Sequence, residues 1–162
     1  MNIAICSDHR GFRAKECVKT VLLKAGHTVE DFGCNEPVSC DYPDLAIPAS
    51  RSIAQGHNDG GVMICGTGIG MGITANKTRG IRAAVCHDEL GAEMARKHND
   101  ANVLCLSADL LGEELIKHIV QIWLDTPFEG GRHERRINKI KQFESSDGAA
   151  HAGGQGPDTG SS

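Results

Sequence analysis

Short apolar segments alternate with longer segments of mixed polarity along most of the chain. Apolar residues recur at helical spacing from Phe12 to Leu22, and this segment stops at Gly26. The same order of apolar run, polar loop and helical spacing then repeats. The pattern predicts strands at residues 2–7, 27–31, 60–65, 81–86 and 101–107. It predicts helices at residues 12–25, 43–55, 89–97 and 110–124, and another from the glycine-rich residues 66–72 to residue 76.

The predicted strands are too apolar to expose one face to water, which is typical of a parallel sheet covered on both sides. We therefore predict an α/β fold, a doubly wound three-layer α/β/α domain of Rossmann-like type with a five-stranded parallel sheet. The domain spans residues 1–144. In such sheets a ligand binds outside the carboxyl ends of the strands, near a switch in strand order.

The end of the chain differs from this pattern. Residues 130–144 form a mostly polar helix with too few apolar residues to hold it on its own domain, so we expect it to pack on a partner subunit. Residues 145–162 contain no Ile, Leu, Val, Met or aromatic residue. We expect this segment to be a disordered Gly/Ser-rich tail.

Composition excludes several classes of protein. The chain has 162 residues, a net charge of −4 and no long basic run, so we expect no nucleic-acid partner. No apolar run is long enough for a membrane span, and the first residues lack the pattern of a secretory signal. Seven cysteines without a C-x-x-C pair favour free thiols in the cytoplasm over disulfides or a structural zinc site.

A glycine-rich segment follows the third predicted strand. It reads Cys65-Gly66-Thr67-Gly68-Ile69-Gly70-Met71-Gly72 and leads directly into a helix. Glycines at this spacing let backbone N–H groups turn toward an anion, although a tight turn alone would also need small residues. The segment matches neither the Walker pattern nor the dinucleotide fingerprint. It predicts a cradle for a small anionic ligand.

Cys65 ends the third strand at the mouth of this cradle, where a helix N-terminus favours a thiolate. It is therefore a candidate base or nucleophile. Cys6, Cys86 and Cys105 also lie in apolar strands, and we expect them to be small buried residues.

Other polar residues suit either a ligand site or a structural role. Asp8 and His9 follow the first strand and suit either a ligand site or a turn with a cap. His98 precedes the fifth strand, where we expect it at the ligand edge, although a cation there also suits a helix end. Arg132 and Arg136 share one helix face, which suits phosphate binding or a solvated basic surface.

Several motifs together resemble one family. They are Ser7-Asp8-His9-x-Gly11, Asp41-Tyr42-Pro43-Asp44, Cys65-Gly66-Thr67-Gly68-Ile69-Gly70, Ala75-Asn76-Lys77, Gly80-Ile81-Arg82-Ala83, His98-Asn99-Asp100, Asn102-Val103-Leu104 and Glu129-Gly130-Gly131-Arg132-His133. In this order they are similar to type B ribose-5-phosphate isomerases, a family that also holds allose- and galactose-6-phosphate isomerases. The resemblance covers roughly residues 2–143.

The resemblance implies metal-free and cofactor-free interconversion of ribose 5-phosphate and ribulose 5-phosphate, a step of the pentose phosphate pathway, through an enediolate. It implies a homodimer, or a tetramer, whose sites take residues from both subunits. It implies that Cys65 is the base and that Thr67 assists proton transfer among the hydroxyls. His98, with Asp8 nearby, would open the sugar ring. The N–H groups of Gly66, Gly68, Ile69 and Gly70 would bind the enediolate. Asn99 would bind a hydroxyl, Tyr42 would lie near the sugar, and His9, Arg132 and Arg136 would bind the phosphate.

Asp109 departs from the family pattern, because many members have a phosphate-binding arginine at this position. A carboxylate there would repel a phosphate unless it pairs with a cation such as Arg132 or Arg136, or unless the substrate differs. His133 matches a position associated with the choice between pentose and hexose phosphates. The alternatives are therefore a 6-phosphohexose isomerase or, from other classes, a flavodoxin-like phosphate- or nucleotide-binding module or a thiol redox protein.

Overall fold

The computed structural model describes residues 1–152, and within them five strands pair in parallel in the order β2-β1-β3-β5-β4. The strands are β1 (Asn2–Ser7), β2 (Thr28–Asp31), β3 (Gly60–Cys65), β4 (Ala83–Val85) and β5 (Val103–Ser107). The predicted five-stranded parallel sheet is confirmed. Strand β4 is shorter than predicted, because Ile81 turns back to bond the carbonyl oxygen of Thr78.

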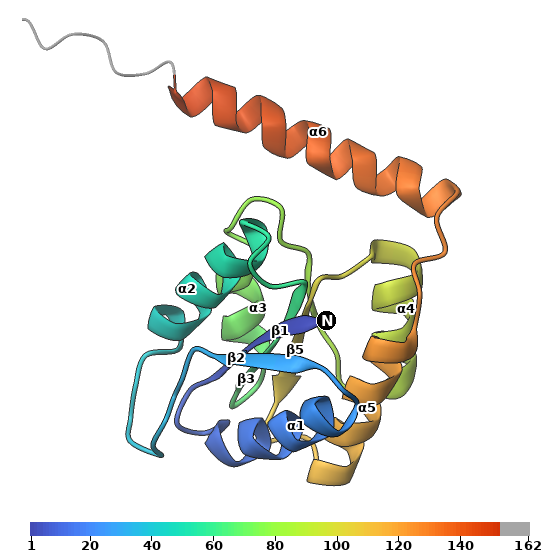
Figure 1. Cartoon of the computed structure of the whole chain (residues 1–162). Coiled ribbons are helices and arrows are strands. Elements are labelled where there is room, and N and C mark those ends of the chain that lie inside the picture. Colours follow the sequence, from blue (N-terminus) through green and yellow to red (C-terminus); the bar gives the residue numbers. More distant parts are fainter. Residues whose placement is uncertain (153–162) are drawn as a thin grey trace, which may run out of the picture.

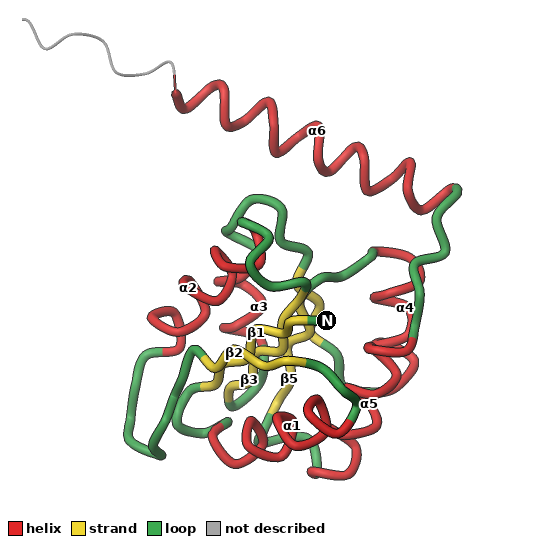
Figure 2. The backbone as a smooth tube through the Cα atoms, viewed as in Figure 1, coloured by secondary structure: helices red, strands yellow, loops and turns green. Residues whose placement is uncertain are grey.

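Helices cover both faces of the sheet (Figure 1). They are α1 (Phe12–Lys24), α2 (Tyr42–Ala54), α3 (Ile69–Ala75), α4 (Glu89–Asn99), α5 (Glu113–Asp125) and α6 (Arg132–Ala152). Helices α1, α4 and α5 bury apolar side chains on one face, and α2 and α3 on the other. Figure 2 shows these two helical layers around the strands. The predicted three-layer α/β/α fold is confirmed.

The strand order reverses between β1 and β3. From β1 the chain passes to β2 on one side of the sheet and then to β3 on the other side, where Ser7 pairs with Ile64. The carboxyl ends of β1 and β3 are therefore neighbours. Because loops leave these two ends toward opposite faces, the edge between them is the position where doubly wound folds bind ligands.

Helix α6 differs from its predicted length. We expected the helix to end at residue 144 and a disordered tail to follow, but the helix continues to Ala152. The sequence places Ala149, Ala150 and Ala152 in this extension, and alanine has the highest helix propensity. The rest of the expected tail, residues 153–162, lies outside the described residues.

An internal ion pair joins α1 to the end of β2. Lys15 is fully buried, and its Nζ lies 2.7 Å from both carboxylate oxygens of Asp31. Lys19 Nζ and the N–H of Gly33 also donate to this carboxylate. Burial raises the pKa of Asp31, but these hydrogen bonds outweigh burial and hold it below its ordinary value.

We expect Asp31→Asn to lower the free energy of unfolding by about 3–5 kcal/mol, because the buried Lys15 ammonium would lose its nearer carboxylate and keep only Glu16 Oε1, at 3.5 Å. Chemical denaturation at fixed protein concentration measures this change. Glu30→Gln is the matched control, since Glu30 is exposed on the same strand. A cost for Asp31→Asn no larger than that of the control would contradict the stabilising role of the pair.

The same pair predicts acid sensitivity. Because the pKa of Asp31 is lower in the folded state, its contribution is complete above the pKa of an unfolded Asp and is lost as pH falls through the folded value. The stability difference between wild type and Asp31→Asn should therefore shrink in acid.

Candidate active site

The loop after β3 holds the sulfur of Cys65 against the backbone. Gly68 adopts a left-handed conformation, with φ of +78°, immediately before α3. A residue with a Cβ atom would be strained there. This turn directs the N–H of Gly68 to Cys65 Sγ at 3.1 Å. Cys65 is 4% exposed, so its sulfur lies at the base of the loop with a backbone donor aimed at it.

The other strand cysteines are buried like Cys65. Burial raises the pKa of the thiols of Cys6 and Cys105, and it raises the pKa of Cys86 to about 11. All four sulfurs, that of Cys65 included, belong to the apolar cores. The burial of Cys6, Cys86 and Cys105 is consistent with the prediction that they are structural, and what sets Cys65 apart is the backbone N–H that its sulfur accepts at the loop.

Tyr42 and Thr67 complete the rim of the loop. The Tyr42 ring packs directly on Gly70, since a Cβ atom there would lie 2.7 Å from Tyr42 Cζ. Thr67 is exposed, and its Oγ1 accepts the N–H of Ile69 at 3.3 Å. The structure thus brings Tyr42 and Thr67 to the same loop as Cys65.

Asp8 and His9 follow β1 at the same edge of the sheet. Asp8 Oδ1 accepts the N–H groups of Arg10 and Gly11, both at 3.0 Å. This oxygen therefore serves the turn before α1, which was the structural alternative for Asp8. His9 is half-buried, and its Nδ1 lies 3.5 Å from the N–H of Cys40.

Arg10 is a site residue that our sequence analysis did not identify. Its Nε lies 2.9 Å and its Nη2 2.7 Å from Asp109 Oδ2. Asp109 therefore pairs with Arg10. The sequence left Arg132 and Arg136 as possible cationic partners, with a different substrate as the alternative. Arg10 follows β1 and Asp109 follows β5, and both strands end at the ligand edge. This shared edge was the only signal in the sequence that could have linked the two residues.

His98 and Asn99 lie elsewhere in the chain, which corrects their expected position. They end α4, which runs back along the sheet before β5, so they lie at the amino edge, opposite Cys65. Arg82, which precedes β4, confirms this placement because its Nε donates to the carbonyl oxygen of Asn99 at 3.0 Å. A residue before a parallel strand enters at the amino edge.

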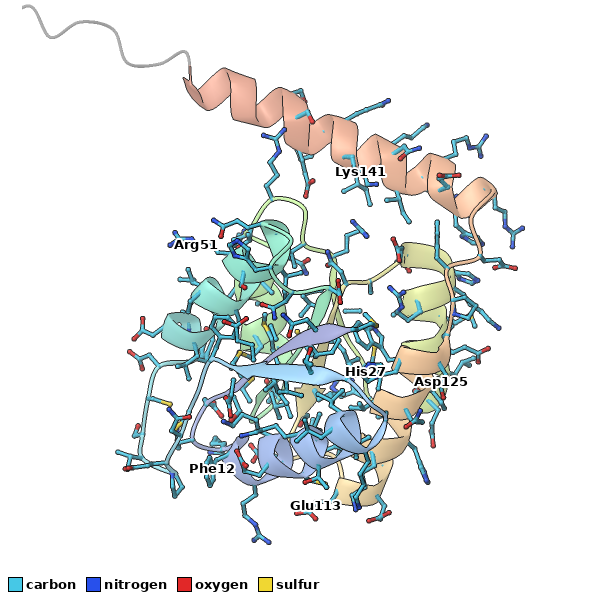
Figure 3. All side chains as sticks on the ribbon, in the orientation of Figure 1. Phe12, His27, Arg51, Glu113, Asp125 and Lys141 are labelled. Atoms are coloured by element: carbon cyan, nitrogen blue, oxygen red, sulfur yellow. The ribbon has the colours of Figure 1, made fainter. Side chains whose placement is uncertain are left out.

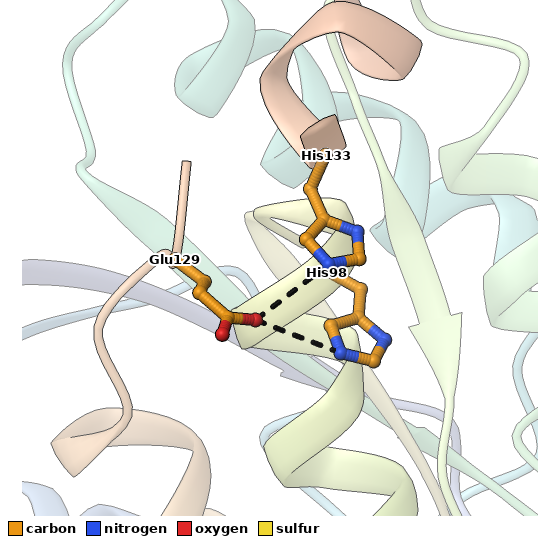
Figure 4. A group of neighbouring side chains, drawn as sticks. All are labelled: His98, Glu129 and His133. Carbon is orange, nitrogen blue, oxygen red and sulfur yellow. Dashed lines mark ion pairs between the residues drawn. The ribbon is translucent and has the colours of Figure 1, made fainter. Parts of the chain in front are cut away.

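A second cluster forms at the amino edge around His98 (Figure 4). The rings of His98 and His133 stack with centroids 4.2 Å apart and an angle of 5° between planes. Glu129 Oε2 lies 3.8 Å from Nε2 of His98 and 3.6 Å from Nε2 of His133. Burial, together with the positive charges of neighbouring His98 and Arg132, lowers the pKa of His133.

These three side chains are close enough to one another to suggest a metal site. The lone pair of an imidazole nitrogen lies in the ring plane. Two stacked and nearly parallel rings cannot direct such lone pairs at one ion, so this arrangement does not fit a metal. The cluster instead suits proton transfer or hydrogen bonding to a polar ligand.

Arg132 and Arg136 are exposed on the first turns of α6. This part of α6 lies at the amino edge, where its His133 stacks on His98. Among the side chains of residues 1–146, neither guanidinium forms an ion pair with a carboxylate. The candidate residues therefore form two groups in one chain. One group surrounds Cys65 at the carboxyl edge, and the other surrounds His98 at the amino edge.

Comparison with known proteins identifies the family. The family model described as Ribose/Galactose Isomerase matches residues 3–140. The chain is 43% identical to ribose-5-phosphate isomerase B of Escherichia coli over 142 residues, which cover 88% of this chain and 95% of that protein. It is 41% identical to D-erythrulose-4-phosphate isomerase of Pectobacterium atrosepticum over 148 residues, which cover 89% and 95%.

A solved structure supports the same assignment. The chain is similar to the crystal structure of a ribose 5-phosphate isomerase from Thermotoga maritima, with 52% identity, a TM-score of 0.84 and coverage of 87% of this chain and 97% of that one. The chain therefore belongs to the ribose/galactose isomerase family and is a sugar phosphate isomerase. Among the described helices, none combines the length and apolar character needed to cross a membrane.

The contact between Tyr42 and Gly70 gives a test of the loop geometry. We expect Gly70→Ala to lower kcat/KM about tenfold or more, because the new Cβ would displace the Tyr42 ring or the loop. Gly112→Ala is the matched control, since a Cβ there meets no atom within 4 Å. Adding Tyr42→Ala to Gly70→Ala should recover part of the loss in a steady-state assay. Unchanged activity of Gly70→Ala would show that the loop tolerates displacement.

Proposed function

We propose that this protein interconverts ribose 5-phosphate and ribulose 5-phosphate, with Cys65 as the base. The single observation that carries the proposal is the position of Cys65 Sγ beside the N–H of Gly68, at the mouth of the glycine loop. A thiolate held there would face both a substrate at the carboxyl edge and the backbone donors of the loop. The identity to ribose-5-phosphate isomerase B supports this substrate.

The chemistry follows from the acidity of a carbon next to a carbonyl. The Cys65 thiolate takes the proton from C2 of the open-chain aldose, and the C–H electron pair forms a double bond to C1 while the aldehyde oxygen becomes anionic. The same thiol returns the proton to C1, and a carbonyl forms at C2. Thr67 transfers a proton between the oxygens on C1 and C2.

The glycine loop stabilises the anionic intermediate. A carbon acid of this kind is weak, so a base alone is not sufficient. The N–H of Gly68 already donates to Cys65 Sγ and that of Ile69 to Thr67 Oγ1. A remaining N–H of residues 66–70 directed at the developing oxyanion would contribute about 3–4 kcal/mol, by analogy with other oxyanion sites. Tyr42 limits the space above Gly70 and orients the sugar.

We propose that the active form is a homodimer, or a tetramer of the same chains, whose sites are shared. In one chain His98, Asn99, Arg132 and Arg136 lie at the opposite edge from Cys65. A second copy would bring its amino edge to the carboxyl edge of the first. His98 of that copy would open the sugar ring, Asn99 would bind a hydroxyl, and the two arginines would join His9 at the phosphate.

The exposed surface of α6 supports such an assembly. Figure 1 shows α6 extending beyond the layers that cover the sheet. Between residues 132 and 146 of this helix, only His133 and Ile137 are buried, whereas Ile140 and Phe143 are 47% and 65% exposed. A long helix with little tertiary packing is marginal in water. Contact with a second copy would cover these apolar residues.

The choice of sugar is the second question. The relative from Pectobacterium is a D-erythrulose-4-phosphate isomerase, so chain length of the sugar varies among similar proteins. A 6-phosphohexose isomerase is the alternative function. Turnover of ribose 5-phosphate, allose 6-phosphate and erythrulose 4-phosphate by the purified protein decides between them, and we expect the highest kcat/KM with ribose 5-phosphate.

We expect Cys65→Ala to lower kcat by about 100-fold to 10,000-fold, the usual contribution of a general base. A coupled assay with ribose 5-phosphate measures this change, and the melting temperature checks the fold. Cys17→Ala is the control, since Cys17 is a partly buried thiol on α1. If Cys65→Ala retained the kcat of the control, Cys65 would not be the base.

Shared sites predict complementation between inactive variants. Cys65→Ala and Arg136→Ala affect different edges, so a mixed dimer would contain one intact site and one doubly defective site. After random mixing about half of the dimers are mixed, and each mixed dimer has one intact site out of two. About a quarter of the wild-type activity should therefore return at low substrate concentration. No recovery in co-refolded mixtures, with mixed dimers verified by mass, would contradict a shared site.

A further inference from the structure

The ion pair between Arg10 and Asp109 lies directly on the glycine loop. A Cβ atom built on Gly66 would be 2.7 Å from Asp109 Oδ2 and 3.1 Å from Arg10 Nε. A Cβ atom at this position would displace the pair. The two charged groups therefore contact the loop itself, at the edge where the substrate would enter.

Both partners are fixed through their backbones. The N–H of Arg10 donates to Asp8 Oδ1 at 3.0 Å, and the N–H of Asp109 donates to the carbonyl oxygen of Gly66 at 3.1 Å. The carbonyl oxygen of Gly66 also accepts from Ser107 Oγ at 2.6 Å. The turns after β1 and β5 are thus tied to the loop, and the side-chain pair joins them above it.

The guanidinium retains hydrogen-bonding capacity. Nε and Nη2 both face Asp109 Oδ2, which leaves the Nη1 group without a partner within residues 1–152. The Arg10 side chain is 58% exposed. A guanidinium held on one side by a carboxylate keeps a fixed orientation and presents its remaining donors in one plane. Such a group is suited to binding phosphate oxygens.

We propose that Arg10 binds the phosphate of the substrate from the same chain as Cys65, and that Asp109 is a positioning residue that holds the guanidinium. This inference rests on the proposed function and adds a binding residue to it. Arg10 follows His9 directly, so both side chains approach the phosphate from one turn. With Arg10 in place the carboxylate of Asp109 is neutralised and does not repel the dianion.

The test compares charge variants by steady-state kinetics. Arg10→Ala should raise both KM for ribose 5-phosphate and the inhibition constant of inorganic phosphate about tenfold or more, with little change in kcat. Arg51→Ala is the matched control, because Arg51 is exposed on the last turn of α2, at the other edge of the sheet from Phe12 and the Arg10 turn (Figure 3). Melting temperatures verify that each variant folds, and Arg10→Lys, which keeps the charge without the fork, should give an intermediate KM.

A rescue series separates binding from structural damage. In Arg10→Ala the Asp109 carboxylate is left unpaired beside the anion, so adding Asp109→Ala should lower KM again. Adding Asp109→Arg to Arg10→Ala should lower KM further, because the two side chains meet and a cation from either turn reaches the same volume. A KM and inhibition constant within about twofold of wild type for Arg10→Ala would overturn the proposal. So would an effect on kcat alone, or a folded double variant that fails to recover.

Failure of the proposed function gives a different result. A wild-type protein that turns over none of the three sugar phosphates would contradict the isomerase proposal. The increase in melting temperature caused by inorganic phosphate still measures anion binding in that case. The proposal then requires this increase to persist in Arg51→Ala and to be lost in Arg10→Ala, and equal increases in both would overturn it.

Discussion

The left-handed turn at Gly68 determines the geometry of the candidate site. Without it, the chain leaving β3 could not fold its amide back onto Cys65 Sγ and still begin α3. The other contacts at this edge depend on the same loop. Tyr42 packs on Gly70, and the turn after β5 binds the carbonyl oxygen of Gly66. One backbone conformation therefore aligns the sulfur, the donors and the side chains that limit the space around them.

The parallel sheet separates the candidate chemistry into two halves. Residues that follow strands reach one edge, and residues that end helices reach the other. The thiol and the backbone donors thus belong to the edge with Cys65, whereas the stacked imidazoles and the exposed Arg132 and Arg136 of α6 belong to the edge with His98. In our proposal, assembly and not folding of one chain completes the reaction centre.

Local sequence patterns predicted a large part of this structure. The order of strands and helices, the layers and the loop after Cys65 depend on periodicity and on glycine spacing, which neighbouring residues encode. Contacts set by strand order were not predictable in this way. Arg10 and Asp109 are 99 positions apart and meet only because β1, β3 and β5 are adjacent. The predicted position of His98 was wrong because it ignored the direction of α4, which ends at the amino edge of the sheet. Helix α6 is longer than predicted, and the alanines in its extension favour a helix by propensity.

The fully buried Lys15 also constrains which amino-acid substitutions this fold can accept during evolution. Its ammonium has no contact with water, so replacing Asp31 alone would leave a desolvated cation, whereas replacing Lys15 alone would leave Asp31 paired with Lys19. An apolar pair could occupy the same volume, and a path of single substitutions to it costs less stability when Lys15 changes first. The order in which the two positions change, and not only the final pair, therefore determines whether the fold stays stable along such a path.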